Sequence, residues 1–368
     1  MTMTWFAGGG LAWLTWSLAG AAQGEGMNKK LIEFGWDEPS TAFMREHWAE
    51  MEQTPFDGCV FHVNYPKPEG GEGNFTWECW SRRAFTWEEL RPALVDLQVT
   101  PFQRFTDNFL RFNTTPADID WFDDYSAVVH NAGLAARLAK EGKVKGILFD
   151  IEQYQGQLFD YRQQRDKATK SWEQYAAQAR RRGREVMEAF QAEYPDITIF
   201  LTFGYCLPWV QTEGGKKPLA EASYGLLAPF LDGMVEAAKD TVRFVDGHEL
   251  SYAFKDPAQF APAYRMMQED LLPIVADPEK YRRVFQFGFG LWLDCGWREH
   301  GWDAEDFSRN FYPPDQFEAS LRAALERCDE YVWVYSETPR WWSPERQRVK
   351  LPLAYWQAVA RAKAAVNR

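Results

Sequence analysis

Residues 146–154 read GILFDIEQY, an apolar run that ends abruptly in two carboxylates. Residues 147–149 carry no charge and are typical of a buried strand, whereas Asp150 and Glu152 follow at its end. Side chains two apart on a strand point to the same face, so these acids should lie roughly 6–7 Å apart at Cα. Two buried like charges raise the pKa of one of them, which is typical of an acid–base site. The alternative is a strand end whose acids meet solvent or a nearby arginine.

Apolar strands also alternate with helices in the sequence before and after this segment. Apolar runs predict eight strands, at residues 31–35, 58–63, 101–108, 144–151, 197–203, 241–246, 284–293 and 331–335. Helices are predicted at residues 41–52, 122–140, 222–238, 257–275, 315–327 and 351–366, and after the capping boxes that begin at Thr86 and Ser171. This alternation predicts the α/β class and a single (β/α)8 TIM barrel with long βα loops. A doubly wound open sheet is the alternative, but no GxGxxG follows the first strand.

The barrel is expected to occupy residues 27–368 as one catalytic domain, because no linker or shift in composition divides that range. Residues 1–26 contain a short apolar run rich in Gly and Ala, and we set them apart as a candidate signal peptide or a mis-assigned start. The run is too short for a comfortable membrane span. A signal peptide would make the protein secreted or periplasmic, which we favour, and a true start at Met27 would make it cytoplasmic.

Composition limits the partners that the protein can have. A formal net charge of −12 over 368 residues argues against nucleic acid, because little positive charge is available to neutralise phosphates. The chain is unusually aromatic, with 18 Trp, 15 Tyr and 27 Phe. Flat rings with a polar edge can stack on sugar faces, so we expect a minority of them to bind carbohydrate and the rest to pack in the core. The five cysteines form no CxxC pair, which argues against a cysteine zinc site.

Polar and aromatic side chains gather where the predicted strands end. In a TIM barrel these carboxyl ends share one face, and the chemistry takes place there. The catalytic candidates are the acids Glu152, Glu337, Asp150 and Glu249. The expected substrate-binding residues are Trp36, Asp37, His62, Asn64, Asp107, Asn108, Tyr154, Tyr205, Asp246, His248, Tyr252, Trp292, Asp294, Trp341 and Trp342. For any single residue the alternative is a polar barrel rim without a catalytic role.

Residues 144–152 resemble the signature of chitinase-type glycoside hydrolases. The positions that match are Val144, Gly146, Ile147, Phe149, Asp150 and Glu152, whereas Lys145 and Leu148 stand where that pattern has an acid or amide. The resemblance implies a barrel in which Glu152 is the general acid and Asp150 orients the acetamido group of the substrate. The missing acid at Leu148 puts substrate-assisted catalysis in question, and the Met-x-Tyr-Asp of that family's sixth strand also has no counterpart here.

The leading prediction is a glycoside hydrolase that cleaves an oligo- or polysaccharide by carboxylic acid/base catalysis, with no cofactor and no metal. Glu152 would be the acid/base, Asp150 would tune it, and Glu337 or Glu249 would be the nucleophile or base. The alternative is a divalent-metal-dependent sugar isomerase, epimerase or hydrolase, whose ligands would be His62, Glu152, His248 and Glu337. A carbohydrate-binding barrel without catalysis ranks third, because binding alone needs no paired acids.

Overall fold

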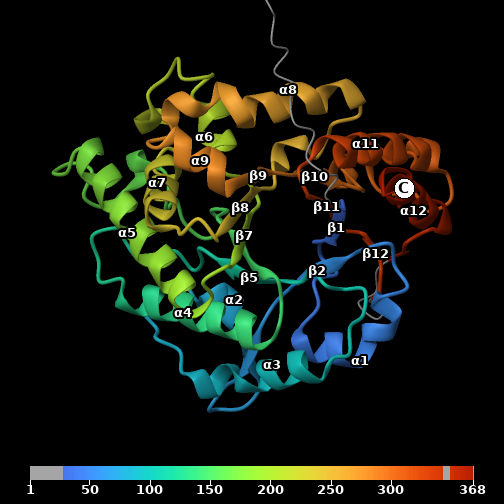
Figure 1. Cartoon of the computed structure of the whole chain (residues 1–368), viewed down its shortest axis with the longest axis horizontal. Helices are drawn as coiled ribbons and strands as arrows, with labels where there is room; N and C mark the ends of the chain where they lie inside the picture. Colours follow the sequence, from blue (N-terminus) through green and yellow to red (C-terminus); the bar gives the residue numbers. More distant parts are fainter. Residues whose placement is uncertain (1–27, 343–348, 368) are drawn as a thin grey trace, which may run out of the picture.

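A computed structural model describes residues 28–342 and 349–367, in which a parallel barrel is surrounded by helices (Figure 1). The barrel strands are β1 (Lys30–Glu33), β2 (Gly58–Phe61), β5 (Phe109–Asn113), β6 (Gly146–Asp150), β7 (Thr198–Leu201), β8 (Arg243–Asp246), β9 (Phe285–Phe287), β10 (Phe289–Trp292) and β11 (Tyr331–Tyr335). They lie in the order β10-β11-β1-β2-β5-β6-β7-β8-β9, and neighbouring strands are parallel. The predicted TIM barrel is therefore confirmed.

The predicted seventh strand is split at Gly288, and this split closes the barrel. β10 and β9 are the first and last strands of the order, and they follow each other directly in the sequence. Because β9 pairs with β8 and β10 pairs with β11, this one segment joins the two edges of the sheet. At the split, the Gly288 amide donates a hydrogen bond to the Asp246 carbonyl at 2.8 Å. A Cβ on Gly288 would lie 2.6 Å from the carbonyl oxygen of Tyr331, so glycine is required at this junction between β9 and β10, the seam of the barrel.

Helices cover the outside of the barrel (Figure 1). The longer ones are α1 (Thr41–Met51), α3 (Trp87–Val99), α4 (Ser126–Glu141), α5 (Trp172–Glu193), α7 (Leu227–Ala237), α11 (Pro314–Arg327) and α12 (Leu353–Val366). The shorter ones are α2 (Phe75–Glu78), α6 (Cys206–Gln211), α8 (Phe260–Arg265), α9 (Pro278–Val284) and α10 (Trp297–His300). The capping boxes that begin at Thr86 and Ser171 open α3 and α5, as predicted. Within the described ranges, no helix combines the length and the apolar character needed to cross a membrane.

Two small sheets extend the loops at the barrel ends. An antiparallel pair, β3 (Asn64–Pro66) and β4 (Glu72–Asn74), occupies part of the long loop expected after the second strand. Near the C-terminus, β12 (Pro339–Arg340) pairs in parallel with β13 (Val349–Lys350).

The barrel strands bury their two faces in separate cores. The outer core, between strands and helices, includes Leu31, Ile147 and Phe149. The lumen is filled by Ile32, Phe34, Val60, Phe109, Leu148, Phe200, Val245, Tyr331 and Trp333, all of them buried. Asp150 lies two residues beyond Leu148 on β6, so it points to the lumen side. The largely aromatic side chains in the lumen therefore form the bottom of the site, and the acids at the carboxyl ends of the strands lie next to them.

The third strand and the sixth helical segment differ from their predicted forms. Residues 101–108 are predicted as the third strand, which is wrong, because β5 begins at Phe109. The charged Arg111 interrupts the apolar run of β5, so the sequence pattern does not indicate a strand there. The predicted helix 257–275 is divided into 3-10 turns, α8 and a π-helical turn, and Pro273, which lacks an amide, lies in the last 3-10 turn. The candidate leader, residues 1–26, and Met27 lie outside the described residues.

The substitution Gly288→Ala tests the seam of the barrel. We expect it to lower the free energy of unfolding by about 1–3 kcal/mol, since the new methyl group must displace backbone at the start of β11. Urea denaturation followed by tryptophan fluorescence measures this change. Gly133→Ala in α4 is the matched control, because a Cβ there meets nothing within 4 Å. The control should be stabilised by roughly 0.5–1 kcal/mol, and equal stability of Gly288→Ala and wild type would contradict the close approach.

Candidate active site

A cavity of about 900 Å³ opens at the carboxyl ends of the barrel strands. Chemistry in TIM barrels occurs at this end, and the volume is in the range of small-molecule sites. The side chains that line it combine acids, bases and aromatic rings. They are Phe34, Trp36, Glu38, His62, Asn74, Trp77, Arg111, Glu152, Tyr154, Glu249, Tyr252, Trp292, Arg298, Tyr335, Glu337 and Arg340, together with Gly35.

Glu152 lies two residues past the end of β6 and is partly buried in the cavity wall. Its backbone amide donates to Asp150 Oδ1 at 3.1 Å, which fixes the turn after the strand. The Tyr154 hydroxyl lies 2.8 Å from Glu152 Oε1 and 3.1 Å from Asp150 Oδ2. Burial and then repulsion from Asp150 raise the pKa of Glu152 to about 7, so this carboxyl holds a proton over much of the range below neutrality.

Asp150 is buried, and Arg111 compensates its charge. The Arg111 Nε atom donates to Asp150 Oδ2 at 3.0 Å, and one terminal nitrogen of the guanidinium donates to Glu38 at 2.7 Å. The guanidinium carbon lies 4.9 Å from the ring centre of Trp77 and 5.0 Å from that of Phe34. This cation is therefore enclosed by two carboxylates and two aromatic faces, where its ion pairs are shielded from water.

Glu249 follows β8 and reaches the same cavity. Its Oε2 atom is buried and has no hydrogen-bond partner among the described residues. Burial, and then repulsion from Glu152 and Asp150, raise the pKa of Glu249 well above its ordinary value. This shift favours the protonated form of Glu249.

Glu337 follows β11 and is held in the opposite way, by hydrogen-bond donors on both oxygens. Its Oε2 accepts from Trp297 Nε1 at 2.7 Å and from Arg298 Nε at 3.0 Å. Its Oε1 accepts from the Tyr335 hydroxyl at 2.9 Å and from a terminal nitrogen of Arg298. The Glu337 amide donates to Asp294 Oδ1 at 3.0 Å, which anchors the backbone. Four donors on two oxygens suit a carboxylate, which has only acceptor sites.

Aromatic rings form the remaining walls of the cavity. Trp36 is 40% exposed and packs edge-on against Trp297, with ring centres 6.4 Å apart. Trp77 lies in α2, and its ring centre is 5.0 Å from that of Tyr154, which is 45% exposed. Exposed ring faces with polar edges are suited to stacking on the apolar face of a sugar.

The structure brings eight of the predicted site residues to the cavity lining. They are Glu152, Glu249, Glu337, Trp36, His62, Tyr154, Tyr252 and Trp292. Asp150 and Asp294 lie behind this lining and orient it, Asp150 through Arg111 and Tyr154, and Asp294 through the amide of Glu337 and the indole of Trp292 at 2.8 Å.

Asp107 and Asn108 lie at the opposite end of the barrel, which corrects their expected place in the site. They precede β5, so they stand at the amino end of that strand. Asp107 pairs with Lys30 Nζ at 3.0 Å and accepts from the Tyr331 hydroxyl at 2.8 Å. Asn108 accepts from the Cys59 amide at 3.1 Å. Both follow from the misplaced third strand.

The segment after β1 is joined to the segment after β11 by three predicted site residues, Asp37, Trp341 and Trp342, which do not line the cavity. The Asp37 carboxylate accepts from the amides of Trp341 and Trp342 at 2.7 and 2.8 Å. Both indoles are buried, and Phe56 packs edge-on against them. Acidic and aromatic residues after a strand suggested a binding site, but here they close the fold.

Four further predicted residues lie outside the cavity lining. Asn64 donates to Glu72 at 3.0 Å within the β3–β4 pair. Tyr205 is buried and donates to Asp232 at 2.9 Å. Asp246 and His248 are buried at the carboxyl end of β8, and the ring centre of His248 lies 5.8 Å from that of Phe289.

Several lining residues, among them Arg111 and Asn74, were not among the predicted site residues. Arg111 is the more important, and its signal in the sequence is a single charge within an apolar run. Asn74 caps α2, where its side chain accepts from the Trp77 amide, and it lies in a segment expected to be an irregular loop.

The metal site of the alternative prediction is not assembled in the structure. His62, Glu152 and Glu337 line the cavity, but His248 does not. Among the described residues, the metal-capable side chains that come together are Cys206, Asp246 and His248, outside that lining.

Comparison with known proteins finds similar folds but no close relative. No family model matches the chain, and no curated protein sequence matches it. Similar solved structures include a β-mannanase from the blue mussel Mytilus edulis, with 9% identity and a TM-score of 0.44 over 92% of this chain and 91% of that one. An endocellulase from Pyrococcus horikoshii in complex with cellotetraose has 11% identity and a TM-score of 0.44 over 93% of each chain. An Anoxybacillus α-amylase has 9% identity and a TM-score of 0.39 over 92% of this chain and 78% of that one. At these identities the likeness assigns no role to any residue of the site.

The substitution Arg111→Met tests the enclosed ion pair. It leaves Asp150 buried without its compensating charge, so we expect the free energy of unfolding to fall by about 3–5 kcal/mol. Thermal and urea denaturation measure this loss. Arg322→Met on α11 is the control, because it removes an exposed Arg322–Glu326 pair and should change the unfolding midpoint little. A variant at Arg111 as stable as the control would show that Asp150 does not depend on this cation.

Proposed function

We propose that this protein is a glycoside hydrolase, with Glu152 as general acid and Glu337 as the carboxylate that acts at the anomeric carbon. The observation that carries the proposal is the contrast between these two acids in one aromatic-lined cavity. Burial and the neighbouring Asp150 favour a proton on Glu152, whereas four hydrogen-bond donors point at the two carboxyl oxygens of Glu337. Two carboxyl groups in opposite environments are what hydrolysis of a glycosidic bond requires.

The proposed reaction begins with a sugar ring stacked against the aromatic wall and its glycosidic oxygen near Glu152. As the bond between the anomeric carbon and that oxygen breaks, the bonding electrons go to the oxygen, which takes the proton of Glu152. Glu337 stabilises the positive charge that develops at the anomeric carbon, either by direct attack or by activating a water. A water molecule ends the cycle by supplying hydroxyl to the sugar and returning a proton to the enzyme.

The other acids of the site would act around this pair. Asp150, held by Arg111, keeps negative charge beside Glu152 and so favours its protonated form. Glu249 in its protonated form would donate a hydrogen bond to a sugar hydroxyl, which a carboxylate cannot do. Trp36 and Tyr154 present exposed rings at the cavity and would stack on successive sugar units of an oligo- or polysaccharide.

The substitution Glu152→Gln tests the role of the general acid. On a panel of aryl glycosides and polysaccharides, we expect it to slow hydrolysis of substrates with poor leaving groups by at least about 10²-fold. In dinitrophenyl glycosides the dinitrophenolate group leaves with little help from a proton, so the same variant should lose far less activity on these substrates. Glu337→Gln should lose activity on both kinds of substrate, because both need a carboxylate at the anomeric carbon.

The exposed Glu326→Gln is the control and should leave the rates unchanged. Equal loss on good and poor leaving groups for Glu152→Gln would contradict its role as the acid. A wild-type protein that cleaves no glycoside until a divalent metal is added would instead favour the metal-dependent sugar enzyme.

A further inference from the structure

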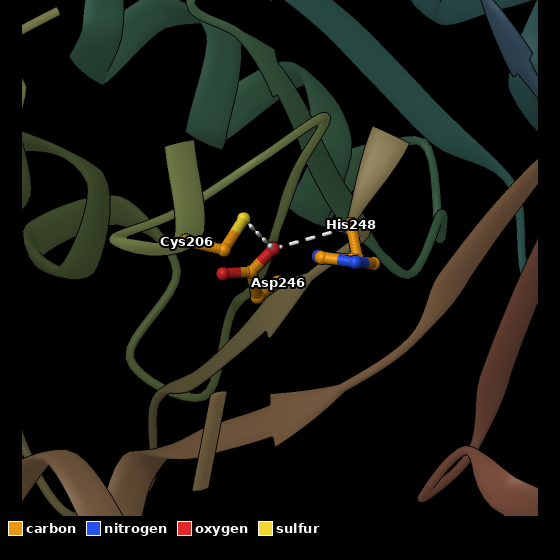
Figure 2. Close-up of side chains that lie close together, drawn as sticks. All are labelled: Cys206, Asp246 and His248. Carbon is orange, nitrogen blue, oxygen red and sulfur yellow. Dashed lines mark hydrogen bonds between the residues drawn. The ribbon is translucent and has the colours of Figure 1, made fainter. Parts of the chain in front are cut away.

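A second cluster of chemically active side chains lies behind the cavity, between the barrel and its outer helices. Cys206 begins α6, Asp246 ends β8, and His248 follows two residues later. Figure 2 shows the three side chains gathered around the Asp246 carboxylate. One donor atom from each lies within 4.8 Å of the other two, and all three residues are at most 2% exposed.

Hydrogen bonds within the protein satisfy this cluster only in part. Asp246 Oδ1 accepts from the His248 amide at 3.0 Å and lies 3.3 Å from the Cys206 sulfur (Figure 2). Asp246 Oδ2 and His248 Nδ1 are buried and have no hydrogen-bond partner within the described part of the chain. The backbone amides of Gly204 and Cys206 also face this carboxylate and favour its charged form. Buried polar atoms are nearly always paired, so the two orphan atoms call for a ligand.

The donor set is that of a borderline transition metal. A thiolate, an imidazole and a carboxylate are the three ligand types that zinc uses in proteins. With bonds of about 2.0–2.3 Å, a tetrahedral ion holds its ligand atoms roughly 3.3–3.8 Å apart. The Cys206 sulfur lies 3.3 Å from Asp246 Oδ1, to which it donates a hydrogen bond in the absence of an ion, so sulfur and carboxylate are already at the short end of this range. The three donor atoms lie within 4.8 Å of one another, so they must move closer together to complete three corners of the tetrahedron.

The backbone at His248 is a second sign of constraint. His248 has φ 41° and ψ 59°, in the left-handed region that residues other than glycine rarely occupy. Local strain of this kind persists where surrounding contacts fix the conformation, and it gathers at functional sites. The next residue, Glu249, lines the catalytic cavity. A ligand on the His248 ring would therefore hold the turn from which Glu249 reaches the cavity.

We propose that Cys206, Asp246 and His248 bind one Zn²⁺ ion, which ties α6 to the end of β8. Binding replaces the thiol proton, which is released to solvent as the sulfur bonds to the metal. A water or a neighbouring group would take the fourth position. The site lies outside the cavity lining, so the ion is structural, and this proposal does not depend on the glycosidase assignment.

The test measures metal binding directly, on the full chain dialysed against metal-free buffer. Wild type should bind about one equivalent of Zn²⁺ tightly, and added Zn²⁺ should raise its melting temperature, because the ion binds only the folded state. Co²⁺ in place of Zn²⁺ should give the near-ultraviolet charge-transfer band of a cobalt–thiolate bond. In Cys206→Ser this band should vanish and affinity should fall at least tenfold, whereas Cys328→Ser, which removes another buried thiol, should behave as wild type.

Two outcomes would overturn the proposal. One is a folded wild type that binds neither Zn²⁺ nor Co²⁺ and shows no cobalt–thiolate band, which would leave a hydrogen-bonded buried cluster. The other is a band that persists in a folded Cys206→Ser. If that variant fails to fold, the wild-type band and its loss in His248→Gln decide the question in its place.

Discussion

The ion pair between Arg111 and Asp150 is the interaction on which the candidate active site depends. An aspartate buried at the end of β6 without a partner would cost several kcal/mol. Arg111, from the adjacent strand β5, balances that charge while Trp77 and Phe34 shield the pair from water. A buried pair of this kind adds little net stability, and its effect is to fix where charge resides. Burial and the charge of Asp150, which Arg111 holds in place, raise the pKa of Glu152 to about 7.

The barrel explains how acids with opposite properties come to share one cavity. Glu152, Glu249 and Glu337 follow strands β6, β8 and β11, which lie far apart in sequence but end at the same face. Glu152 and Glu337 take their character from different loops. Residues 150–154 supply repulsion and burial around Glu152, whereas Trp297 and Arg298 of α10 supply the donors that hold Glu337. Changes in one loop can therefore alter one acid and leave the other in place.

The sequence was sufficient for the fold and for part of the site. Eight apolar runs predicted the barrel, and two carboxylates after the fourth run marked Asp150 and Glu152. Arg111 was missed because its partners come from other strands and its own strand was read as a loop, which also misplaced Asp107 and Asn108. Asp37 and Trp342 looked like site residues because spacing cannot distinguish a side chain that faces the cavity from one that closes the fold. The cluster at Cys206 was hidden for a similar reason, since its ligands have no recurring spacing.

The titration of Glu152 is the direct test of its role as the proton donor. Carboxyl-carbon NMR of glutamate-labelled protein can follow it, and Glu152→Gln assigns the signal by its absence. We expect a midpoint near 7, so the acid form is present below that pH and is lost as the pH rises through it. Removing the neighbouring charge in Asp150→Asn should move the midpoint down. A wild-type midpoint near the ordinary glutamate value of about 4.3 would contradict the claim that Asp150 and burial keep the proton on Glu152.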